Sequence, residues 1–276
     1  MSVAVKDAFG RRFELPGPAC RIVSLIPSIT ETFFSLGVGD RVAGVTKFCT
    51  EPPDGVRTKP KVGGQKNPRL DAIAALKPDL VVSNIEENRR EDVEAMWAAG
   101  LRVLVTYPRT VREGIQLIRD LGVLTGERDR AEVMATRCDE ALAEAARRTA
   151  GRRPVRIFCP IWRRPYMTIN GDTYVDDMLR ICGGESIFHD RQERYPTVTL
   201  AEMAARRPEV ILLPDEPFPF SDRHLTDFHA LPDVPAVRAG RLCLVDGKVV
   251  SWYGPRIAES LRTLTGILRP VMQEKS

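Results

Sequence analysis

Short runs of β-branched, apolar residues alternate with helical stretches along most of the chain. Strands are predicted over residues 22–26, 42–46, 80–83, 103–105, 155–159, 210–213 and 242–245. Helices are predicted over residues 28–36, with Ser28 as the N-cap, and over residues 90–99, 173–181 and 255–268. This alternation is typical of βαβ units, in which helices connect parallel strands. The chain is therefore predicted to be an α/β protein with mostly parallel sheets.

One long helical stretch interrupts this pattern. Residues 127–149 are rich in Ala, Glu and Arg and contain neither Gly nor Pro. A helix over this stretch is about 33 Å long at 1.5 Å per residue, longer than any other predicted element. We expect an amino-terminal α/β lobe over residues 1–125, a linking helix over residues 126–150 and a carboxyl-terminal α/β lobe over residues 151–276.

An internal repeat supports two similar lobes. Residues 70–82 (LDAIAALKPDLVV) align with residues 200–212 (LAEMAARRPEVIL), and residues 100–103 match residues 240–243 more weakly. Each longer segment reads as a short amphipathic helix, a proline that stops it, an acidic residue and a buried strand. Open α/β sheets bind ligands at the carboxyl ends of their strands, so we expect a ligand cleft between the lobes.

Composition excludes several classes of function. The 276 residues carry 41 Lys and Arg against 37 Asp and Glu, a net charge of +4. A dedicated nucleic-acid binder would show a larger and more concentrated basic surplus. The longest stretch without a charged residue is Ile22–Thr30, whereas a membrane span needs about 18 apolar residues. We expect no nucleic-acid partner and no membrane span.

The cysteines and the amino terminus bear on the compartment. The six cysteines form no CxxC pair and are expected to be reduced and mostly buried. The first seven residues show no apolar leader region and no small-residue cleavage site. A cytoplasmic location is expected if Met1 is the native start.

The usual signatures of catalysis are absent from the sequence. It contains no nucleophile elbow, phosphate loop, HExxH motif or kinase motif set. Only three histidines are present, and His224 and His229 are spaced so that they would not share a helix face. An enzyme would have to use Cys49 or the Asp176–Asp177 pair with a base nearby. We expect no enzymatic activity and no protein metal site.

Aromatic residues follow several predicted strands, on loops that contain proline. They are Phe48, Trp162, Tyr166, Tyr195, Phe218, Phe220, Trp252 and Tyr253. Aromatic side chains on stiff loops form a wall for a large flat ligand at low ordering cost. The alternative is that some of them anchor loops to the core.

Several motifs, spread over nearly the whole chain, together resemble one family. They are RIVSLIPSITE at 21–31, LGVGD at 36–40, VAGV at 42–45, ALKPDLV at 75–81, GGESIF at 183–188 and GPR at 254–256. The chain resembles the class III substrate-binding proteins of ABC importers, receptors for cobalamin, haem and ferric siderophores, and is most similar to their cobalamin-binding members. The resemblance implies two lobes on a rigid helix with modest hinge motion, an extracytoplasmic location and no enzymatic activity.

The resemblance also implies a site. A corrinoid would be held between the lobes without a covalently bound cofactor. Because the chain has only three histidines and none is obviously in the cleft, no protein ligand to cobalt is expected. Phe48 matches an aromatic that faces the corrin ring, Tyr195 stands where a receptor Trp precedes Pro, and Trp252 lies near another cleft Trp. Polar residues such as Ser28, Thr46 and Glu216 would bond the amide edge of the ligand. The expected contacts are Pro27, Ser28, Phe48, Cys49, Trp162, Tyr166, Tyr195, Glu216, Phe218, Phe220, Trp252 and Tyr253.

The family docks on its permease through one exposed acid in each lobe. Asp71 matches the first acid, shortened from the usual Glu. The second aligns with Ala201, and Glu202 is its neighbour. One residue along a helix turns a side chain by about 100°, so both carboxylates have the alternative reading of solvated helix-face residues.

Three alternatives remain open at the level of the sequence. Haem or a ferric siderophore could replace the corrinoid, and Arg163–Arg164 would suit an anionic chelate. A cytosolic corrinoid-binding or scaffold protein could keep the fold without an importer. The third is the enzyme described above. A monomer is expected in each case, with ABC permease subunits as partners only of an importer.

Overall fold

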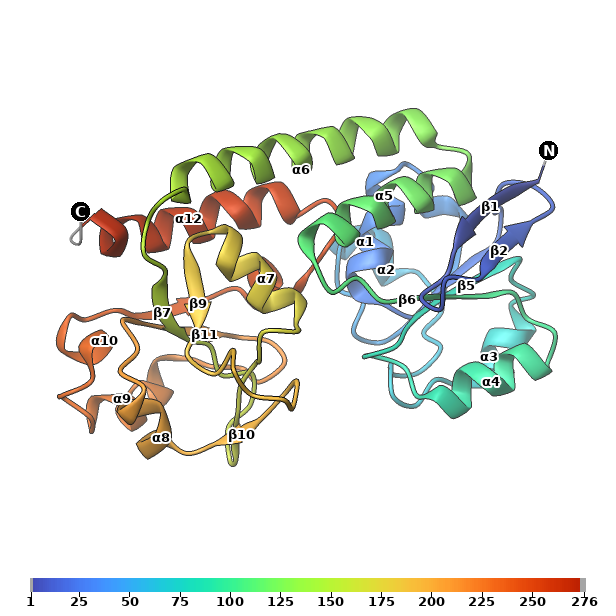
Figure 1. The fold of residues 1–276 in the computed structure, drawn as a ribbon. Helices are drawn as coiled ribbons and strands as arrows, with labels where there is room; N and C mark the ends of the chain where they lie inside the picture. The colour runs from blue at the N-terminus through green and yellow to red at the C-terminus, as the bar shows by residue number, and fades with distance from the viewer. Residues whose placement is uncertain (1, 274–276) are drawn as a thin grey trace. The chain divides into compact units, whose positions relative to one another are not determined.

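The computed structural model describes residues 2–273 and shows a mixed α/β protein with two compact units (Figure 1). The first unit comprises the chain up to Pro108, Arg112–Arg137 and Tyr253–Pro255, and the second comprises Arg109–Val111, Cys138–Trp252 and the chain from Arg256. The helix expected over residues 127–149 is α6 (Arg128–Thr149), which contributes residues to both units. The lobe boundaries at residues 125 and 151 stay a prediction.

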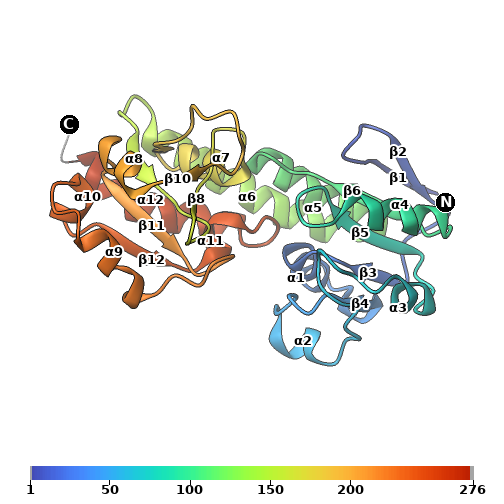
Figure 2. The same ribbon diagram turned by 90° about the horizontal axis from the view of Figure 1, so that it is seen from below.

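The first unit is built on a parallel sheet in the order β4-β3-β5-β6 (Figure 2). The strands are β3 (Ile22–Ser24), β4 (Val42–Val45), β5 (Leu80–Asn84) and β6 (Val103–Thr106). Nearly all of their residues are buried, as expected for a parallel sheet covered on both faces. The other elements are the hairpin β1 (Val3–Lys6) and β2 (Arg12–Leu15), α1 (Pro27–Ser35), η1 (Gly39–Arg41), α2 (Pro53–Arg57), α3 (Leu70–Ala75), α4 (Arg90–Ala98) and most of α5 (Val111–Thr125).

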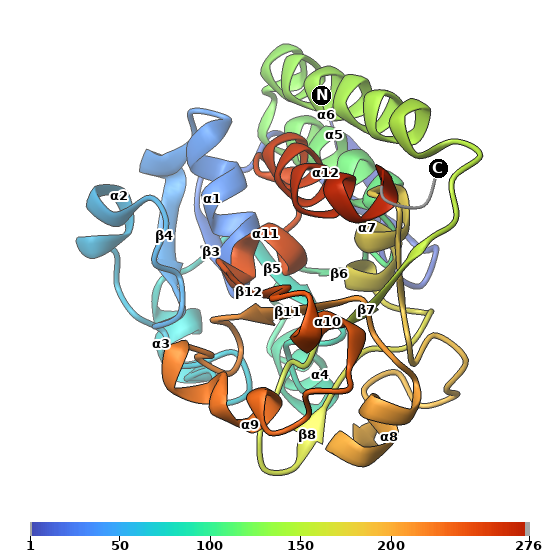
Figure 3. The same cartoon turned by 90° about the vertical axis from the view of Figure 1, so that its left-hand side faces the viewer.

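The second unit repeats this sheet in the order β12-β11-β7-β9, of which β12, β11 and β7 are labelled in Figure 3 and β9 in Figure 1. The strands are β7 (Val155–Phe158), β9 (Gly184–Ser186), β11 (Val210–Pro214) and β12 (Leu242–Val245). The helices are α7 (Tyr174–Ile181), α8 (Leu200–Ala205), η2 (Asp222–His224), α9 (Thr226–His229), α10 (Pro235–Arg238), α11 (Gly247–Ser251) and α12 (Ile257–Gln273). A small antiparallel pair joins β8 (Tyr166–Met167) to β10 (Thr197–Val198). Numbered along the chain, the strands of each sheet have the same order, 2-1-3-4.

The internal repeat is confirmed at the level of backbone geometry. In the first unit α3 leads into β5, and in the second α8 leads into β11. The residues at the equivalent turns, Lys77 and Arg207, both adopt left-handed backbone, with φ of 46° and 49°. Non-glycine residues rarely occupy this region, so the shared strain marks a shared turn.

A carboxylate fixes this turn to the first strand in each unit. Asp79 accepts hydrogen bonds from the backbone N–H groups of Cys20 (2.7 Å) and Arg21 (3.0 Å). Glu209 accepts one from the N–H of Arg156 (3.0 Å). The equivalent guanidinium groups complete the tie, since Arg21 donates to the Leu76 carbonyl and Arg156 to the Arg206 carbonyl. We call this arrangement the carboxylate tie.

The structure corrects several expected elements. Ser28 is not the N-cap of α1, because the helix begins at Pro27, which needs no N–H partner at the first helical position. The strand β9, which begins at Gly184, was not expected, and the last helix, expected to end at residue 268, continues through Pro270. The β1–β2 hairpin and α5 were not expected, and α5 contains Gly114 and Gly122, which weaken a helical pattern.

The structure bears on two expectations from composition, one about the cysteines and one about a membrane span. All six cysteines are free thiols, and four of them are buried, which confirms that they are mostly buried. Among residues 2–273, no helix combines the length and apolar character needed to cross a membrane.

Asp176 is a fully buried carboxylate between α7 and β9. It accepts a hydrogen bond from the Ser186 N–H (3.3 Å), while its second oxygen has no partner among the described residues. Burial raises the pKa of Asp176 from 3.8 to about 6, although Arg180 and His189 favour the charged form. Glu185 acts in the same direction as burial.

The folded protein therefore holds this proton more tightly than the unfolded chain. The contribution of Asp176 to the unfolding free energy should fall by about 3 kcal/mol as pH rises from about 4 to above 6. Asp176→Asn removes this dependence, so the variant should gain stability relative to the native protein across that window in urea unfolding. Asp54→Asn, at an exposed position of α2, is the control. A difference between Asp176→Asn and the native protein that stays constant with pH would contradict the prediction.

Candidate functional site

In both units the predicted site residues lie after the carboxyl ends of the sheet strands. In a 2-1-3-4 order, the chain leaves strand 1 toward one edge of the sheet and strand 3 toward the other edge. Open α/β sheets bind ligands at the carboxyl ends of the two strands between which the direction changes. In the first unit this point lies between β3 and β5, and in the second between β7 and β11. We describe the two loop clusters separately.

In the first unit, Tyr253 is packed against the start of α1. Its hydroxyl accepts a hydrogen bond from Asn84 Nδ2 at the end of β5 (3.2 Å). Burial raises the pKa of Tyr253, while the hydroxyls of Ser28 and Thr106 act in the opposite direction. The next residue, Gly254, has φ of 94°, and a Cβ there would lie 2.3 Å from Thr32 Oγ1. The glycine of the GPR motif is therefore needed for the close approach to α1.

Phe48 is the exposed aromatic of this unit's cluster. It follows β4, and 49% of its surface is accessible. The ammonium of Lys47 lies 5.0 Å from the ring centre. An exposed ring at the carboxyl end of a sheet strand is available to a flat ligand. Pro27, the first residue of α1, is half-buried beside the fully packed helix interior.

Cys49 belongs to the core and is 1% exposed. Its Sγ lies 3.1 Å from Thr30 Oγ1 and 3.2 Å from Thr46 Oγ1. Burial raises the pKa of the thiol, which disfavours the thiolate that nucleophilic chemistry requires. Thr46 is also fully buried. We therefore leave Cys49 and Thr46 out of the proposed ligand contacts.

In the second unit, the exposed Trp162 and the half-buried Phe218 form an aromatic layer. Trp162 follows β7, is 43% exposed and meets Phe218 edge to face, with ring centres 5.8 Å apart. Beneath it, Phe218 packs on Phe220 at 4.7 Å and on His224 at 5.2 Å. Phe220 and His224 are buried, so Phe220 supports the layer from within the core.

The loop that carries Trp162 is held by an ionic clamp. Asp227 on α9 accepts two hydrogen bonds from the Arg163 guanidinium (2.7 and 3.0 Å) and one from the Tyr166 hydroxyl (2.5 Å). A backbone bridge between Trp162 and Met167 closes the hairpin. Hydrogen bonding from Arg163 lowers the pKa of Asp227, and burial raises the pKa of Tyr166 to about 12. Tyr166 is thus a clamp residue within the protein rather than an open ligand wall.

Trp252 is also fixed by protein contacts. Its Nε1 donates to Glu216 Oε2 (3.2 Å), and its ring is 7% exposed. The cationic groups of Lys248 and Arg256 lie 5.8 and 5.5 Å from the ring centre. Burial raises the pKa of Glu216. Two of the predicted contacts, Glu216 after β11 and Trp252 after α11, are therefore joined by a hydrogen bond.

Tyr195 is half-buried and lies beside the Arg194 guanidinium, 5.8 Å from its ring centre. Arg194 is in turn paired with Asp172 at 2.7 Å. The aromatic face of Tyr195 is thus partly covered by the side chain that precedes it.

The two expected docking carboxylates have different surroundings. Asp71 is exposed in the first turn of α3. Glu202 forms a capping box with Thr199, accepting its backbone N–H at 2.8 Å, and pairs with Arg191 at 2.8 Å. The Thr199 N–H is the main cause of the lowered pKa of Glu202. Glu202 therefore stabilises the start of α8, whatever else it contacts.

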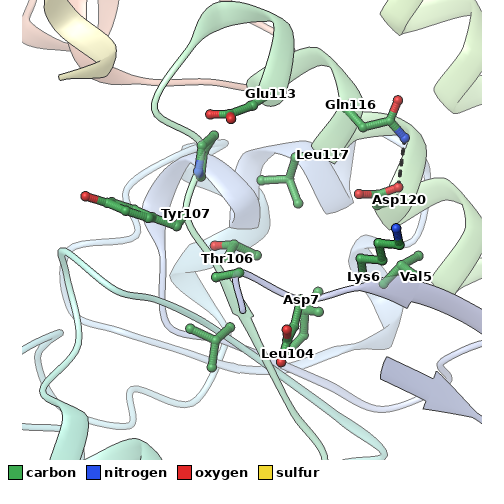
Figure 4. Close-up of a pocket in the computed structure, with 13 residues that line it drawn as sticks. Val5, Lys6, Asp7, Leu104, Thr106, Tyr107, Glu113, Gln116, Leu117 and Asp120 are labelled. Carbon is green, nitrogen blue, oxygen red and sulfur yellow. Dashed lines mark hydrogen bonds between the residues drawn. The ribbon is translucent and has the colours of Figure 1, made fainter. Parts of the chain in front are cut away.

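A separate hollow of about 240 Å³ lies in the first unit, between the β1–β2 hairpin, β6 and α5 (Figure 4). Asp120 and Gln116 line it and are joined by a hydrogen bond of 2.9 Å. Burial raises the pKa of Asp120. None of the predicted site residues lines this hollow. Across the described chain, no three His, Cys, Asp or Glu side chains are placed to hold a metal ion.

The sequence did not identify Asp227, Asn84 or Lys248 as parts of these clusters. Asp227 lies on a four-residue helix, more than sixty positions from Arg163. No periodic pattern connects residues at such a separation. The one sequence signal was the presence of Arg163, Arg164 and Tyr166 beside Trp162. These side chains need an acidic partner, but the sequence does not show where that partner lies.

Comparison with known proteins shows what this chain is similar to. It is 27% identical to the vitamin B12-binding protein of Photorhabdus laumondii over 70% of each chain. The solved periplasmic vitamin B12-binding protein of Vibrio cholerae has the same fold, with a TM-score of 0.83, 21% identity and coverage of 94% of this chain and 100% of the other. The periplasmic heme-binding protein of Roseiflexus has a TM-score of 0.77, 26% identity and coverage of 92% and 99%.

The family itself is identified by a family model that matches most of the chain. Residues 22–249, well over half of the chain, match the model described as periplasmic binding protein. The resemblance expected from the sequence is confirmed, and the chain belongs to the periplasmic binding protein family.

Proposed function

We propose that this protein is an extracytoplasmic substrate-binding protein that captures a corrinoid and delivers it to an ABC importer. The observation that carries the proposal is the Trp162–Phe218 layer, in which Trp162 is exposed and its loop is held in place by Asp227. The name of the Photorhabdus laumondii relative supports a ligand of the vitamin B12 class. Phe48 supplies an exposed ring in the other unit, and we propose that loops of both units contribute contacts.

The binding step needs no bond to be made or broken. Transfer of a large flat ring from water onto aromatic side chains is favourable because apolar surface is buried. A side chain already fixed by hydrogen bonds loses little freedom when the ligand arrives. The Asp227 clamp fixes the Trp162 loop in advance, so ordering of this loop costs little on binding. The protein acts in this proposal as a monomeric receptor without catalytic chemistry.

Haem is the second candidate ligand. The 26% identity to the Roseiflexus heme-binding protein favours it, and an aromatic layer also suits a porphyrin ring. Arg163 and Arg164 follow Trp162 in the sequence, and Arg163 is neutralised by Asp227. Titration with each of the two ligands distinguishes a corrinoid receptor from a haem receptor.

Titration of the purified protein with cyanocobalamin, followed by tryptophan fluorescence and calorimetry, tests the proposal. We expect one-to-one binding with a Kd below about 1 µM, equivalent to more than about 8 kcal/mol. Trp162→Ala should weaken binding by about 1–3 kcal/mol, because a stacking surface is lost. Phe9→Ala removes a similarly exposed aromatic from the β1–β2 hairpin turn and should leave the affinity unchanged.

Absence of cyanocobalamin binding, together with saturable one-to-one binding of hemin, would replace the corrinoid by haem. Equal effects of Trp162→Ala and Phe9→Ala on affinity would show that the aromatic layer does not contact the ligand.

Asp227→Asn tests the role of the clamp. The amide keeps the shape of the carboxylate but loses the charge-assisted bidentate pairing with Arg163. We expect about a tenfold loss of affinity and a faster-moving Trp162, seen as lower fluorescence anisotropy in a variant whose other two tryptophans are phenylalanine. Tyr166→Phe, which removes one hydrogen bond, should give a smaller loss. Unchanged affinity and anisotropy in Asp227→Asn would contradict this role.

A further inference from the structure

A basic hollow lies at the amino-terminal edge of the second sheet, where β7 and β11 begin. Its volume is about 430 Å³, and its charged lining consists of Arg153, Arg156, Arg206, Arg207 and Glu209. The aromatic layer follows the carboxyl ends of the same strands. The hollow is therefore separate from the proposed corrinoid contacts and does not depend on them.

Comparison with the first unit shows which charged residues of the hollow belong to the repeated fold and which are specific to the second unit. Arg156 and Glu209 form the carboxylate tie, which Arg21 and Asp79 form in the first unit. Arg207 occupies the left-handed turn position that Lys77 occupies in the first unit. These groups have structural counterparts, so by themselves they indicate no ligand.

Two further arginines have no counterpart in the first unit. The position equivalent to Arg206 is Leu76, and the position three residues before Arg21, equivalent to Arg153, is Pro18. The second unit has thus added two guanidinium groups to a turn that the first unit builds without them. Arg206 also has contacts within the fold, to the Ile187 carbonyl and to Asp190, whereas Arg153 is exposed.

The positive charge in the hollow exceeds the negative charge available to balance it. Glu209 is the only carboxylate in the lining, and its Oε1 lies 4.0 Å from Arg153. Arg206 pairs with Asp190 outside the lining, at 2.6 and 3.1 Å. Within residues 2–273, the Arg207 guanidinium has no carboxylate partner. With Arg206 balanced by Asp190, the guanidinium groups of Arg153, Arg156 and Arg207 face one lining carboxylate, and this surplus of two positive charges suits an anion of more than one charge.

We propose that this hollow binds a phosphate-class oxyanion, free or as part of a larger molecule. Guanidinium groups bind phosphate oxygens through two parallel hydrogen bonds, and several can bind one anion at once. The exposed Arg153 and Arg207 reach the anion from the rim, while Arg156 and Arg206 are half-buried and held by backbone carbonyl contacts. The hollow has room for more than one phosphate group.

Calorimetric titration with inorganic pyrophosphate at constant ionic strength tests the proposal. We expect saturable binding by the native protein and at least a tenfold loss in Arg153→Gln/Arg207→Gln, which leaves the carboxylate tie intact. Lys77→Gln, at the matched turn of the first unit, should bind like the native protein. Cyanocobalamin titration of the double variant should be unchanged, which separates this proposal from the corrinoid proposal.

Sedimentation with vesicles that contain phosphatidic acid distinguishes the source of the phosphate. Binding of both pyrophosphate and vesicles, each lost in the double variant, would assign the hollow to a lipid headgroup. Binding of pyrophosphate alone would assign it to a soluble phosphate compound. The proposal fails if the native protein gives no saturable response to pyrophosphate, or if the double variant responds equally.

Discussion

The carboxylate tie is the interaction on which the arrangement of each unit depends. Asp79 and Glu209 hold the turn before the third strand against the start of the first strand. The neighbouring strands are parallel, so this single contact sets their stagger and places their carboxyl ends at a common edge. The loops that bear the exposed aromatics leave from that edge. Position of the functional side chains thus follows from a contact at the opposite end of the sheet.

The second unit shows how a loop can be exposed and ordered at once. A large aromatic that faces water without support would lose rotational freedom when it binds a ligand. Trp162 is instead held from below by Phe218 and from the side by the Arg163–Asp227–Tyr166 contacts. Charge-assisted hydrogen bonds to a half-buried carboxylate are among the stronger contacts available to a surface loop. These contacts hold an exposed aromatic ring in a fixed position, as the proposed binding of a flat ligand requires.

The sequence predicted the sheet strands and the repeat well, because buried parallel strands are short continuous apolar runs. It also predicted that aromatics gather after the strands. It could not predict which way each side chain points, since a loop has no periodicity from which to read a face. Phe48 and Trp162 are exposed, whereas Cys49, Phe220 and Trp252 are turned into the protein. Asp227 was missed because its partners are distant along the chain.

Hydrogen exchange with and without cyanocobalamin tests the central claim most directly, because it reports on the loops of both units in one experiment. The account predicts slower exchange after ligand addition in the Phe48 loop, residues 46–50, and in the Trp162 hairpin, residues 160–167. It also predicts no change in the arginine-lined hollow at the start of β7 and β11. Unchanged exchange in both loops, with the ligand demonstrably bound, would contradict the assignment of the site to the carboxyl ends of the two sheets.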